Sequence, residues 1–279
     1  MTVQTALLQG STLLEEAAIP VARLTAEVLL AHAVRRERAW LFGHPEHELS
    51  ELERLHYGRY LHERLQGKPT QYITGRQEFY GREFRVTPDV LIPRQETEHV
   101  VETAVRLARG AARILDVGCG SGILAVTMRL ETGAGVWATD ISVAAVRVAA
   151  GNAQRLGAPV SFVACDLASA LAATSMDLIV CNPPYVPLGD KAGLQREIRD
   201  WEPPQALFAG PTGLEIYERL AGDAERVLAP GGWLVMEIGY NSRDRVAALF
   251  SSRWRDLEAV PDLAGIPRVL AARRNWCKP

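Results

Sequence analysis

The second half of the chain alternates short apolar segments with segments of helical pattern, and this alternation restricts the possible folds more than any other feature. The apolar segments lie at 114–117, 136–140, 160–164, 178–181 and 233–238, and helical patterns separate them near 122–131, 142–157, 212–228 and 241–250. Repeated strand and helix units give parallel strands with helices on both faces of the sheet. The sequence therefore predicts a doubly wound α/β fold whose functional residues lie at the carboxyl ends of the strands.

A glycine-rich segment directly follows the first of these strands and opens a helix. It reads Asp116-Val117-Gly118-Cys119-Gly120-Ser121-Gly122. Glycines there let the backbone turn tightly and approach a ligand closely. A dinucleotide fingerprint needs glycine or alanine where this chain has Ile123, so a nicotinamide cofactor is disfavoured. Asp116 instead favours a cationic cofactor, because a carboxylate pairs with the α-amino group of S-adenosylmethionine. The residues predicted to bind it here are Asp116, Gly118, Cys119, Gly120, Ser121 and Gly122.

Two more carboxylates end the next two strands. Asp140 is placed to accept hydrogen bonds from both ribose hydroxyls of a nucleoside. Asp166 is placed to accept one from the adenine amine, with Leu167 against the ring. Each residue alone is also typical of an ordinary turn, but carboxylates at three successive strand ends predict a nucleoside cofactor. Cys119 is expected to fill the tight loop and not to act as a nucleophile, because no histidine lies near it in the sequence to activate it.

The fourth strand ends in Asn182-Pro183-Pro184-Tyr185. Two prolines stiffen the backbone, which directs the asparagine oxygen and a proline carbonyl outward as a pair of hydrogen-bond acceptors. Such a pair fits an NH₂ group, and Tyr185 offers a flat face to the planar group that carries it. An amide or aromatic amine nitrogen is a weak nucleophile, so holding its hydrogens orients and polarises it toward a methyl donor. These four residues are the predicted catalytic and substrate-binding set, and Asn182 is also expected to contact the cofactor, although the motif is also a good strand-terminating turn.

The first part of the chain has a helical pattern. Val21, Leu24, Val28 and Ala31 recur at helical spacing and predict one buried helix face. Ser50 and Glu53 form a predicted capping box at the start of a further helix, and Gly67 and Pro69 are expected to end it. We therefore expect a small helical substrate-recognition domain over residues 1–70.

A strand pattern follows, with aromatic and β-branched residues around Gly81 in the segment 79–86. It predicts a β-hairpin connector over residues 71–94. The catalytic domain is then expected to occupy residues 95–279.

Charge and composition exclude several classes of protein. The net charge is −2, and the first 110 residues hold 14 basic and 15 acidic side chains, so no segment has the basic excess that nucleic acid binding needs. No apolar stretch reaches the roughly 20 residues of a membrane-spanning helix, and no basic leader precedes one, so we expect a cytoplasmic protein without a membrane partner. The cysteines and histidines match no metal-ligand spacing, so no metal is expected. The four cysteines are Cys119, Cys165, Cys181 and Cys277.

Together these motifs resemble the class I S-adenosylmethionine-dependent methyltransferases that modify a nitrogen through Asn-Pro-Pro-Tyr. More narrowly, residues 1–273 resemble the PrmC/HemK family of release factor glutamine methyltransferases. The narrower resemblance rests on Gly-Arg-Gln-Glu-Phe-Tyr at 75–80, Leu-Ile-Pro-Arg at 91–94, Thr-Glu at 97–98, the segments 116–122 and 182–185, and Arg-Glu-Ile-Arg-Asp-Trp-Glu-Pro at 196–203. The chain departs from the family at Gln95-Glu96, where Pro-Asp is usual, and at Trp201, where Tyr is common.

The resemblance implies a Rossmann-like sheet of seven mostly parallel strands, with S-adenosyl-L-methionine as methyl donor and S-adenosyl-L-homocysteine as product. It also implies the substrate, the glutamine of the Gly-Gly-Gln motif in class 1 peptide chain release factors, methylated on its side-chain N5. The helical domain is then expected to help bind the release factor. Phe79 and Tyr80 are expected to join Tyr185 in packing on the plane of the amide.

Two alternatives remain open at this point. A nucleic-acid amine methyltransferase, acting on adenine N6 or cytosine N4, shares the Asn-Pro-Pro-Tyr motif but is disfavoured by the even charge distribution. A nicotinamide-dependent oxidoreductase or a non-catalytic nucleotide-binding module shares the glycine-rich loop. A comparison of the affinities for S-adenosylmethionine and for NAD distinguishes a methyltransferase from the oxidoreductase and from the nucleotide-binding module.

Overall fold

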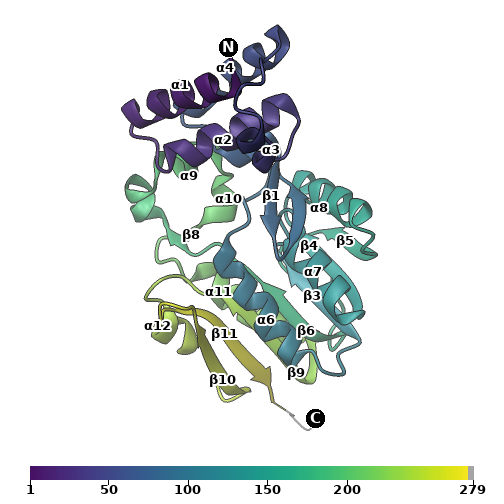
Figure 1. Cartoon of the computed structure of the whole chain (residues 1–279). Helices are drawn as coiled ribbons and strands as arrows, with labels where there is room; N and C mark the ends of the chain where they lie inside the picture. The colour runs from purple at the N-terminus through teal and green to yellow at the C-terminus, as the bar shows by residue number, and fades with distance from the viewer. Residues whose placement is uncertain (276–279) are drawn as a thin grey trace. The chain divides into compact units, whose positions relative to one another are not determined.

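The computed structural model describes residues 1–275 and contains two compact units, shown in Figure 1. One unit combines residues 1–76 with 195–201, and the other combines 77–194 with the chain from 202 onward. The first unit therefore takes in a short segment that lies far away in the sequence. The division at 70 and 94 expected from the sequence stays a prediction.

The first unit is helical. Its elements are α1 (Val3–Glu16), α2 (Ala22–Val34), α3 (Arg38–Gly43), α4 (Glu51–Leu65), α5 (Thr70–Thr74) and α9 (Arg196–Trp201). The capping box at Ser50 and Glu53 is confirmed: the Ser50 hydroxyl accepts from the Glu53 amide, and the Glu53 carboxylate accepts from the Ser50 amide. Helix α9 is held in this unit by an ion pair between Glu197 and Arg64, whose side chain is buried.

The predicted buried face of α2 is wrong. Val21 precedes the helix and is 72% exposed, Leu24 is 41% exposed, and only Ala31 of the four residues is buried. The face that packs into the core of this unit instead contains Ala26, Leu29 and Leu30. Because most residues of α2 are apolar, apolar spacing alone does not identify which side of the helix is covered.

The predicted hairpin forms between β1 (Arg76–Phe79) and β2 (Arg82–Arg85). Its two turn residues, Tyr80 and Gly81, both have positive φ, at 51° and 71°. This is the backbone of a type I′ turn, which matches the twist of paired strands. The segment just before it, predicted as strand from residue 71, is instead the short helix α5.

The second unit contains a seven-stranded sheet in the order β10-β11-β9-β6-β3-β4-β5. The strands are β3 (Arg113–Val117), β4 (Gly135–Asp140), β5 (Val160–Ala164), β6 (Met176–Cys181), β9 (Leu228–Glu237), β10 (Trp254–Pro261) and β11 (Pro267–Arg274). Strand β11 pairs antiparallel with both of its neighbours, and the other pairings are parallel. The mostly parallel α/β sheet predicted from the sequence is confirmed.

Helices cover both faces of this sheet, as Figure 1 shows. Alternate residues of each strand point to opposite faces. Ile114 and Leu178 pack in one core with α6 (Glu98–Leu107), α7 (Ile123–Thr132) and α8 (Val143–Arg155). Leu115 and Ile179 pack in the other with α11 (Glu215–Val227) and α12 (Arg243–Ala247). The sheet is therefore buried on both sides, and its strand ends are left to carry polar groups.

Short elements connect the strand ends of this unit. They are η1 (Gln95–Thr97), β7 (Val186–Pro187), η2 (Leu188–Gly193), α10 (Pro204–Leu207) and β8 (Phe208–Gly210). Gln95 and Glu96, the departure from the family pattern, form the start of η1 and lead directly into α6.

Within residues 1–275 no helix combines the length and the apolar character needed to cross a membrane. Over the same residues, no three histidine, cysteine or acidic side chains are grouped as metal ligands. Cys119, Cys165 and Cys181 are free thiols, and Cys277 lies outside the described residues.

Candidate active site

A cavity of about 300 Å³ lies at the carboxyl ends of β3, β4, β5 and β6. Ligands bind at this edge in open α/β sheets, because the loops there leave a crevice and their backbone amides face it. Ten of the residues predicted from the sequence line the cavity. They are Asp116, Gly118, Cys119, Gly120, Ser121, Asp140, Asp166, Leu167, Asn182 and Pro184. The structure thus brings the predicted cofactor residues other than Gly122 together with Asn182 around one space.

Asp116 is a buried carboxylate with one unused oxygen. Its Oδ2 accepts a hydrogen bond of 2.9 Å from the Ala125 amide, and no described residue donates to Oδ1. Burial, with a smaller contribution from the nearby Asp140 carboxylate, raises the pKa of Asp116 to about 8, and the hydrogen bond from the Ala125 amide opposes this rise. A buried oxygen without a donor is costly. A cationic amine in the cavity supplies both the missing donor and the compensating charge, so the residue fits the α-amino group of S-adenosylmethionine.

The glycine-rich loop is held by backbone hydrogen bonds. The amides of Gly118 and Cys119 both donate to the carbonyl of Thr139, at 2.8 Å each. Asn152 of α8, fully buried, donates from its side chain to the carbonyl of Ser121 at 2.9 Å and to that of Arg85 at 2.9 Å. These bonds fix the loop against β4 and against the hairpin. No local sequence pattern around Asn152 indicates this role.

Gly122 does not line the cavity; it lies where α7 packs against α8. Its φ is +84°, and a Cβ built there lies 3.0 Å from the Cβ of Ala149. Gly118 also has positive φ, at +73°, but a Cβ there meets nothing within 4 Å. Both glycines are therefore required by the backbone, and only Gly122 is also required by helix packing.

Gly122→Ala is expected to lower the free energy of unfolding by about 1–2 kcal/mol more than Gly118→Ala does, because it adds a packing conflict to the same backbone strain. Gly118→Ala is the matched control and is expected to weaken cofactor binding, because Gly118 lines the cavity. Urea unfolding of both variants measures the difference. Equal losses of stability contradict the packing role.

Asp140 ends β4 with its carboxylate oriented by two backbone amides. Its Oδ2 accepts from Gly120 at 2.9 Å, and its Oδ1 accepts from Ser142 at 2.8 Å. A carboxylate oxygen can accept two hydrogen bonds, so each oxygen of Asp140 can accept a further one from a ribose hydroxyl. The proposed contact with the ribose stays a prediction.

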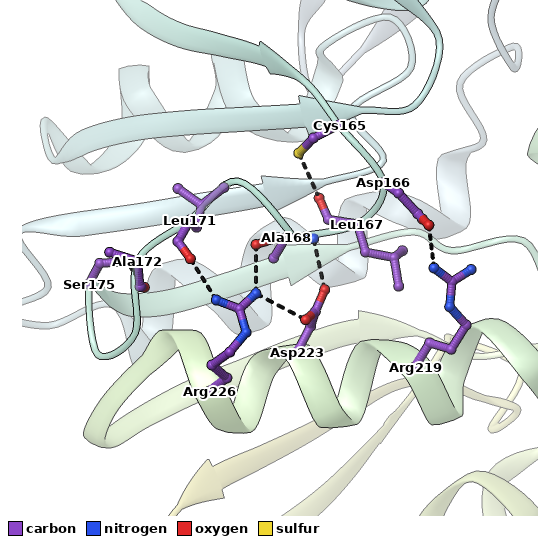
Figure 2. A network of polar contacts seen from close by, with 10 residues as sticks. All are labelled: Cys165, Asp166, Leu167, Ala168, Leu171, Ala172, Ser175, Arg219, Asp223 and Arg226. Carbon is purple, nitrogen blue, oxygen red and sulfur yellow. Dashed lines mark hydrogen bonds and ion pairs between the residues drawn. The ribbon is translucent and has the colours of Figure 1, made fainter.

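The loop after β5 carries the residues expected at the adenine, and helix α11 anchors it (Figure 2). Asp223 accepts from the Ala168 amide at 3.0 Å, and the Arg226 guanidinium donates to the carbonyls of Ala168 and Leu171 at 2.8 and 2.6 Å. These bonds hold Leu167 at φ 46°, a strained conformation for leucine, beside the cavity.

Asp166 is paired with Arg219 of α11, as Figure 2 shows. Both side chains line the cavity and are about half exposed. Only Oδ2 of Asp166 takes part in this ion pair, so Oδ1 is left for a donor such as the adenine amine. That contact stays a prediction, and Arg219 is a cavity residue that the sequence did not identify.

Cys119 is buried in the glycine-rich loop. Burial, together with the Asp116 and Asp140 carboxylates, raises the pKa of its thiol well above the ordinary value. A thiol with a raised pKa is a poor nucleophile. This agrees with a space-filling role for Cys119.

Asn182 is joined to a buried hydrogen-bond network that connects three elements. Its Nδ2 donates to the hydroxyl of Thr97 at 3.1 Å, and that hydroxyl donates to Oε2 of Glu237 at 2.6 Å. The hydroxyl of Tyr185 donates to the other carboxylate oxygen, Oε1, at 3.4 Å. Two residues of the Asn-Pro-Pro-Tyr motif therefore depend on one carboxylate at the end of β9. Among the described residues, none donates to Oδ1 of Asn182.

The expectation for Phe79 is contradicted by its position. Its side chain is fully buried in the core and packs edge-on against Phe84, with ring centroids 6.2 Å apart, so no face is free for a substrate. Tyr80 is half-buried in the hairpin turn, and its amide donates to Glu98. The described residues that line the cavity do not include Phe79 or Tyr80. They also do not include Pro183 or Tyr185.

Several further residues at the site were missed at the sequence level. Thr97 belongs to one of the motifs shared with the family, but no local pattern indicates a role for it or for Glu237. Arg94 lines the cavity and pairs at 2.6 Å with Glu202, whose side chain is buried. These partners come from segments more than 80 residues apart, so local spacing carries no signal for them.

Comparison with known proteins assigns the family. Residues 5–75 match the PrmC N-terminal domain, and residues 98–196 match the methyltransferase small domain. A release factor glutamine methyltransferase from Koribacter versatilis is 45% identical over 278 residues, which cover 98% of this chain and 99% of that protein. Another, from Nitratidesulfovibrio vulgaris, is 40% identical over 287 residues, which cover 100% of this chain and 97% of that protein.

Solved structures show the same fold at low identity. The hMettl16 catalytic domain in complex with MAT2A 3'UTR hairpin 1 is 15% identical, with a TM-score of 0.56 over 90% of this chain and 92% of that one. The ribosomal protein L11 methylase of Lactobacillus delbrueckii subsp. bulgaricus is 20% identical, with a TM-score of 0.51 over 71% of this chain and 90% of that one. These likenesses support the Rossmann-like methyltransferase fold alone. The full-length relatives go further, and they show that this chain belongs to the family of release factor glutamine methyltransferases.

Proposed function

We propose that this protein transfers a methyl group from S-adenosyl-L-methionine to the side-chain nitrogen N5 of the glutamine in the Gly-Gly-Gln motif of class 1 release factors. One observation supports the proposal most strongly: Asp116 and Asn182 line the same cavity. Asp116 has a buried oxygen without a hydrogen-bond donor, and Asn182 is held by its NH₂ group. The first suits the methyl donor and the second suits an amide acceptor. The helical unit is proposed to contact the release factor, in the cytoplasm and without direct contact to nucleic acid.

The donor half of the cavity contains three carboxylates with distinct roles. Asp116 binds the α-amino group, Asp140 binds the ribose hydroxyls, and Asp166 binds the adenine amine, with Leu167 against the ring. When bound, S-adenosylmethionine supplies a methyl group on a positively charged sulfur. The protein's own residues bind and orient it.

The acceptor half orients the glutamine amide. Oδ1 of Asn182 and the carbonyl of Pro183 accept the two amide hydrogens, and Pro184 stiffens the turn that holds both groups. Accepting these hydrogens draws electron density onto the nitrogen, which is otherwise delocalised into the amide carbonyl, and holds it in line with the methyl group. Tyr185 packs near this plane, with its hydroxyl tied to Glu237. Methyl transfer would leave one surplus hydrogen on the nitrogen, which is lost as a proton to water; because a protonated amide nitrogen is strongly acidic, no strong general base is required.

The nucleic-acid alternative is not favoured. The relatives that match the whole chain are named for release factor glutamine, and the first 110 residues have no excess of basic side chains for contacts with phosphates.

Purified protein incubated with methyl-labelled S-adenosylmethionine and a class 1 release factor is expected to place one methyl group on the Gly-Gly-Gln peptide, located by mass spectrometry. A release factor whose Gly-Gly-Gln glutamine is replaced by alanine serves as control and should remain unlabelled. Label in added DNA or RNA, with none in the release factor, contradicts the proposal.

A further inference from the structure

Thr97 and Glu237 are connected to Asn182 by hydrogen bonds, and neither is among the described residues that line the cavity. We infer that these two residues form a positioning pair that sets which end of the Asn182 side-chain amide faces the acceptor. The inference rests on the proposed function, because it specifies how the acceptor site of that reaction is kept in its active arrangement.

The orientation follows from the position of a single proton. A threonine hydroxyl donates one hydrogen and accepts at its lone pairs. The 2.6 Å contact with Oε2 of Glu237 uses the donor of Thr97, because an ionised carboxylate only accepts. Toward Asn182 the hydroxyl is then an acceptor, and only the NH₂ end of the amide bonds to it, at 3.1 Å. Oδ1 of Asn182 is thereby left for the substrate.

The surroundings of the pair make this orientation strict. Thr97 is fully buried and Glu237 is 3% exposed, so no solvent competes for their hydrogen bonds. Glu237 also accepts a hydrogen bond from Tyr185. The same carboxylate therefore contacts both Thr97 and the aromatic residue of the Asn-Pro-Pro-Tyr motif. The titratable groups that act on Glu237 or are acted on by it are Glu96 of η1, Arg268 of β11, Tyr185, Tyr217 of α11 and Cys181 of β6.

Protonation of Glu237 reverses the arrangement. A carboxyl protonated on Oε2 donates to Thr97, so the threonine hydrogen turns toward Asn182 and the amide oxygen becomes its partner. The NH₂ group of Asn182 then faces the NH₂ group of the substrate, donor against donor. Burial raises the pKa of Glu237 to about 7, opposed by its hydrogen bond from Thr97, so this change falls near neutral pH. Glu237 is protonated below that pKa, and turnover decreases as the pH falls through it.

Thr97→Val removes the hydroxyl at nearly constant volume and is expected to lower kcat about 20-fold, because a poorly oriented acceptor reduces proximity. The Kd for S-adenosylmethionine is expected to change less than about threefold. Thr97→Ser keeps the hydroxyl and should recover most of kcat. Thr127→Val is the matched control, because Thr127 of α7 is equally buried and its hydroxyl has no partner among the described residues. A wild-type kcat in Thr97→Val, or no recovery in Thr97→Ser, overturns the inference.

The second measurement follows the orientation directly. The ¹H–¹⁵N signals of the Asn182 side chain, assigned by their loss in Asn182→Asp, are expected to titrate with a midpoint at about pH 7 in the wild type. The Asn182 signals should show no titration near pH 7 in Glu237→Gln, because glutamine keeps an acceptor oxygen but cannot ionise. The decline of kcat at low pH should also disappear in this variant. An unchanged titration or an unchanged decline overturns the inference.

The two measurements also separate this inference from the proposed function. A wild-type protein that transfers no methyl group to release factor contradicts the proposed function, while the titration of Asn182 still decides the role of Thr97 and Glu237. If Thr97→Val does not fold, the comparison of wild type with Glu237→Gln decides it alone.

Discussion

Asn182→Ala is expected to lower kcat for release factor methylation by about 10²–10³-fold, the usual loss when one preorganised polar contact at the reacting centre is removed. The physical reason is that the glutamine nitrogen loses the oxygen that accepts its hydrogen, so it is neither polarised nor held in line. Single-turnover kinetics with saturating cofactor measure the loss directly. Because the cofactor carboxylates are untouched, the Kd for S-adenosylmethionine is expected to stay within about threefold of wild type.

Calorimetry with S-adenosylmethionine is the control for this variant. Retained cofactor affinity with lost turnover places Asn182 in the acceptor half of the cavity. An active Asn182→Ala protein excludes the acceptor role, and a variant that loses cofactor affinity and turnover together shows that Asn182 acts in the donor half instead.

Asp116→Asn is expected to weaken binding of S-adenosylmethionine by about 100-fold, as expected when one partner of a buried charge pair is removed. The substitution preserves size, but it removes the negative charge that faces the α-amino group. Asp177→Asn is the matched control: Asp177 binds the amides of Ala112 and Arg113 at the start of β6 and does not line the cavity. Its affinity for the cofactor should equal that of the wild type.

The raised pKa of Asp116, about 8, predicts how this affinity changes with pH. Below that pH the carboxyl of the free protein is protonated, and pairing with a cation requires that the proton be released. Affinity is therefore expected to fall by up to about tenfold for each unit of pH below 8. Calorimetry in buffers of different ionisation enthalpy counts the released proton. Asp116→Asn should show neither the proton release nor the pH dependence, and their persistence in that variant assigns them to another group.

The parallel sheet and the residues at its strand ends were predictable because they depend on local order. A buried parallel strand is a continuous apolar run, so the segments around Leu115, Val136 and Ile179 are predictable from their composition alone. The segment around Phe162 forms a partly exposed strand at the edge of the sheet, and its apolar residues also predict it. Strands β10 and β11 were not identified as segments, because their charged residues interrupt the apolar pattern. Their place at the edge of the sheet depends on pairing with β9.

The same distinction holds within the active site. Asp116, Asp140 and Asn182 each follow a strand directly, and parallel strands end at one edge of a sheet, so their meeting in one cavity follows from the order of residues along the chain. Burial and proton position do not follow from that order. The buried position of Phe79 away from the cavity, the unpartnered oxygen of Asp116 and the bond from Thr97 to Glu237 arise from contacts between segments distant in sequence, where desolvation and hydrogen-bond partners are set by packing in three dimensions.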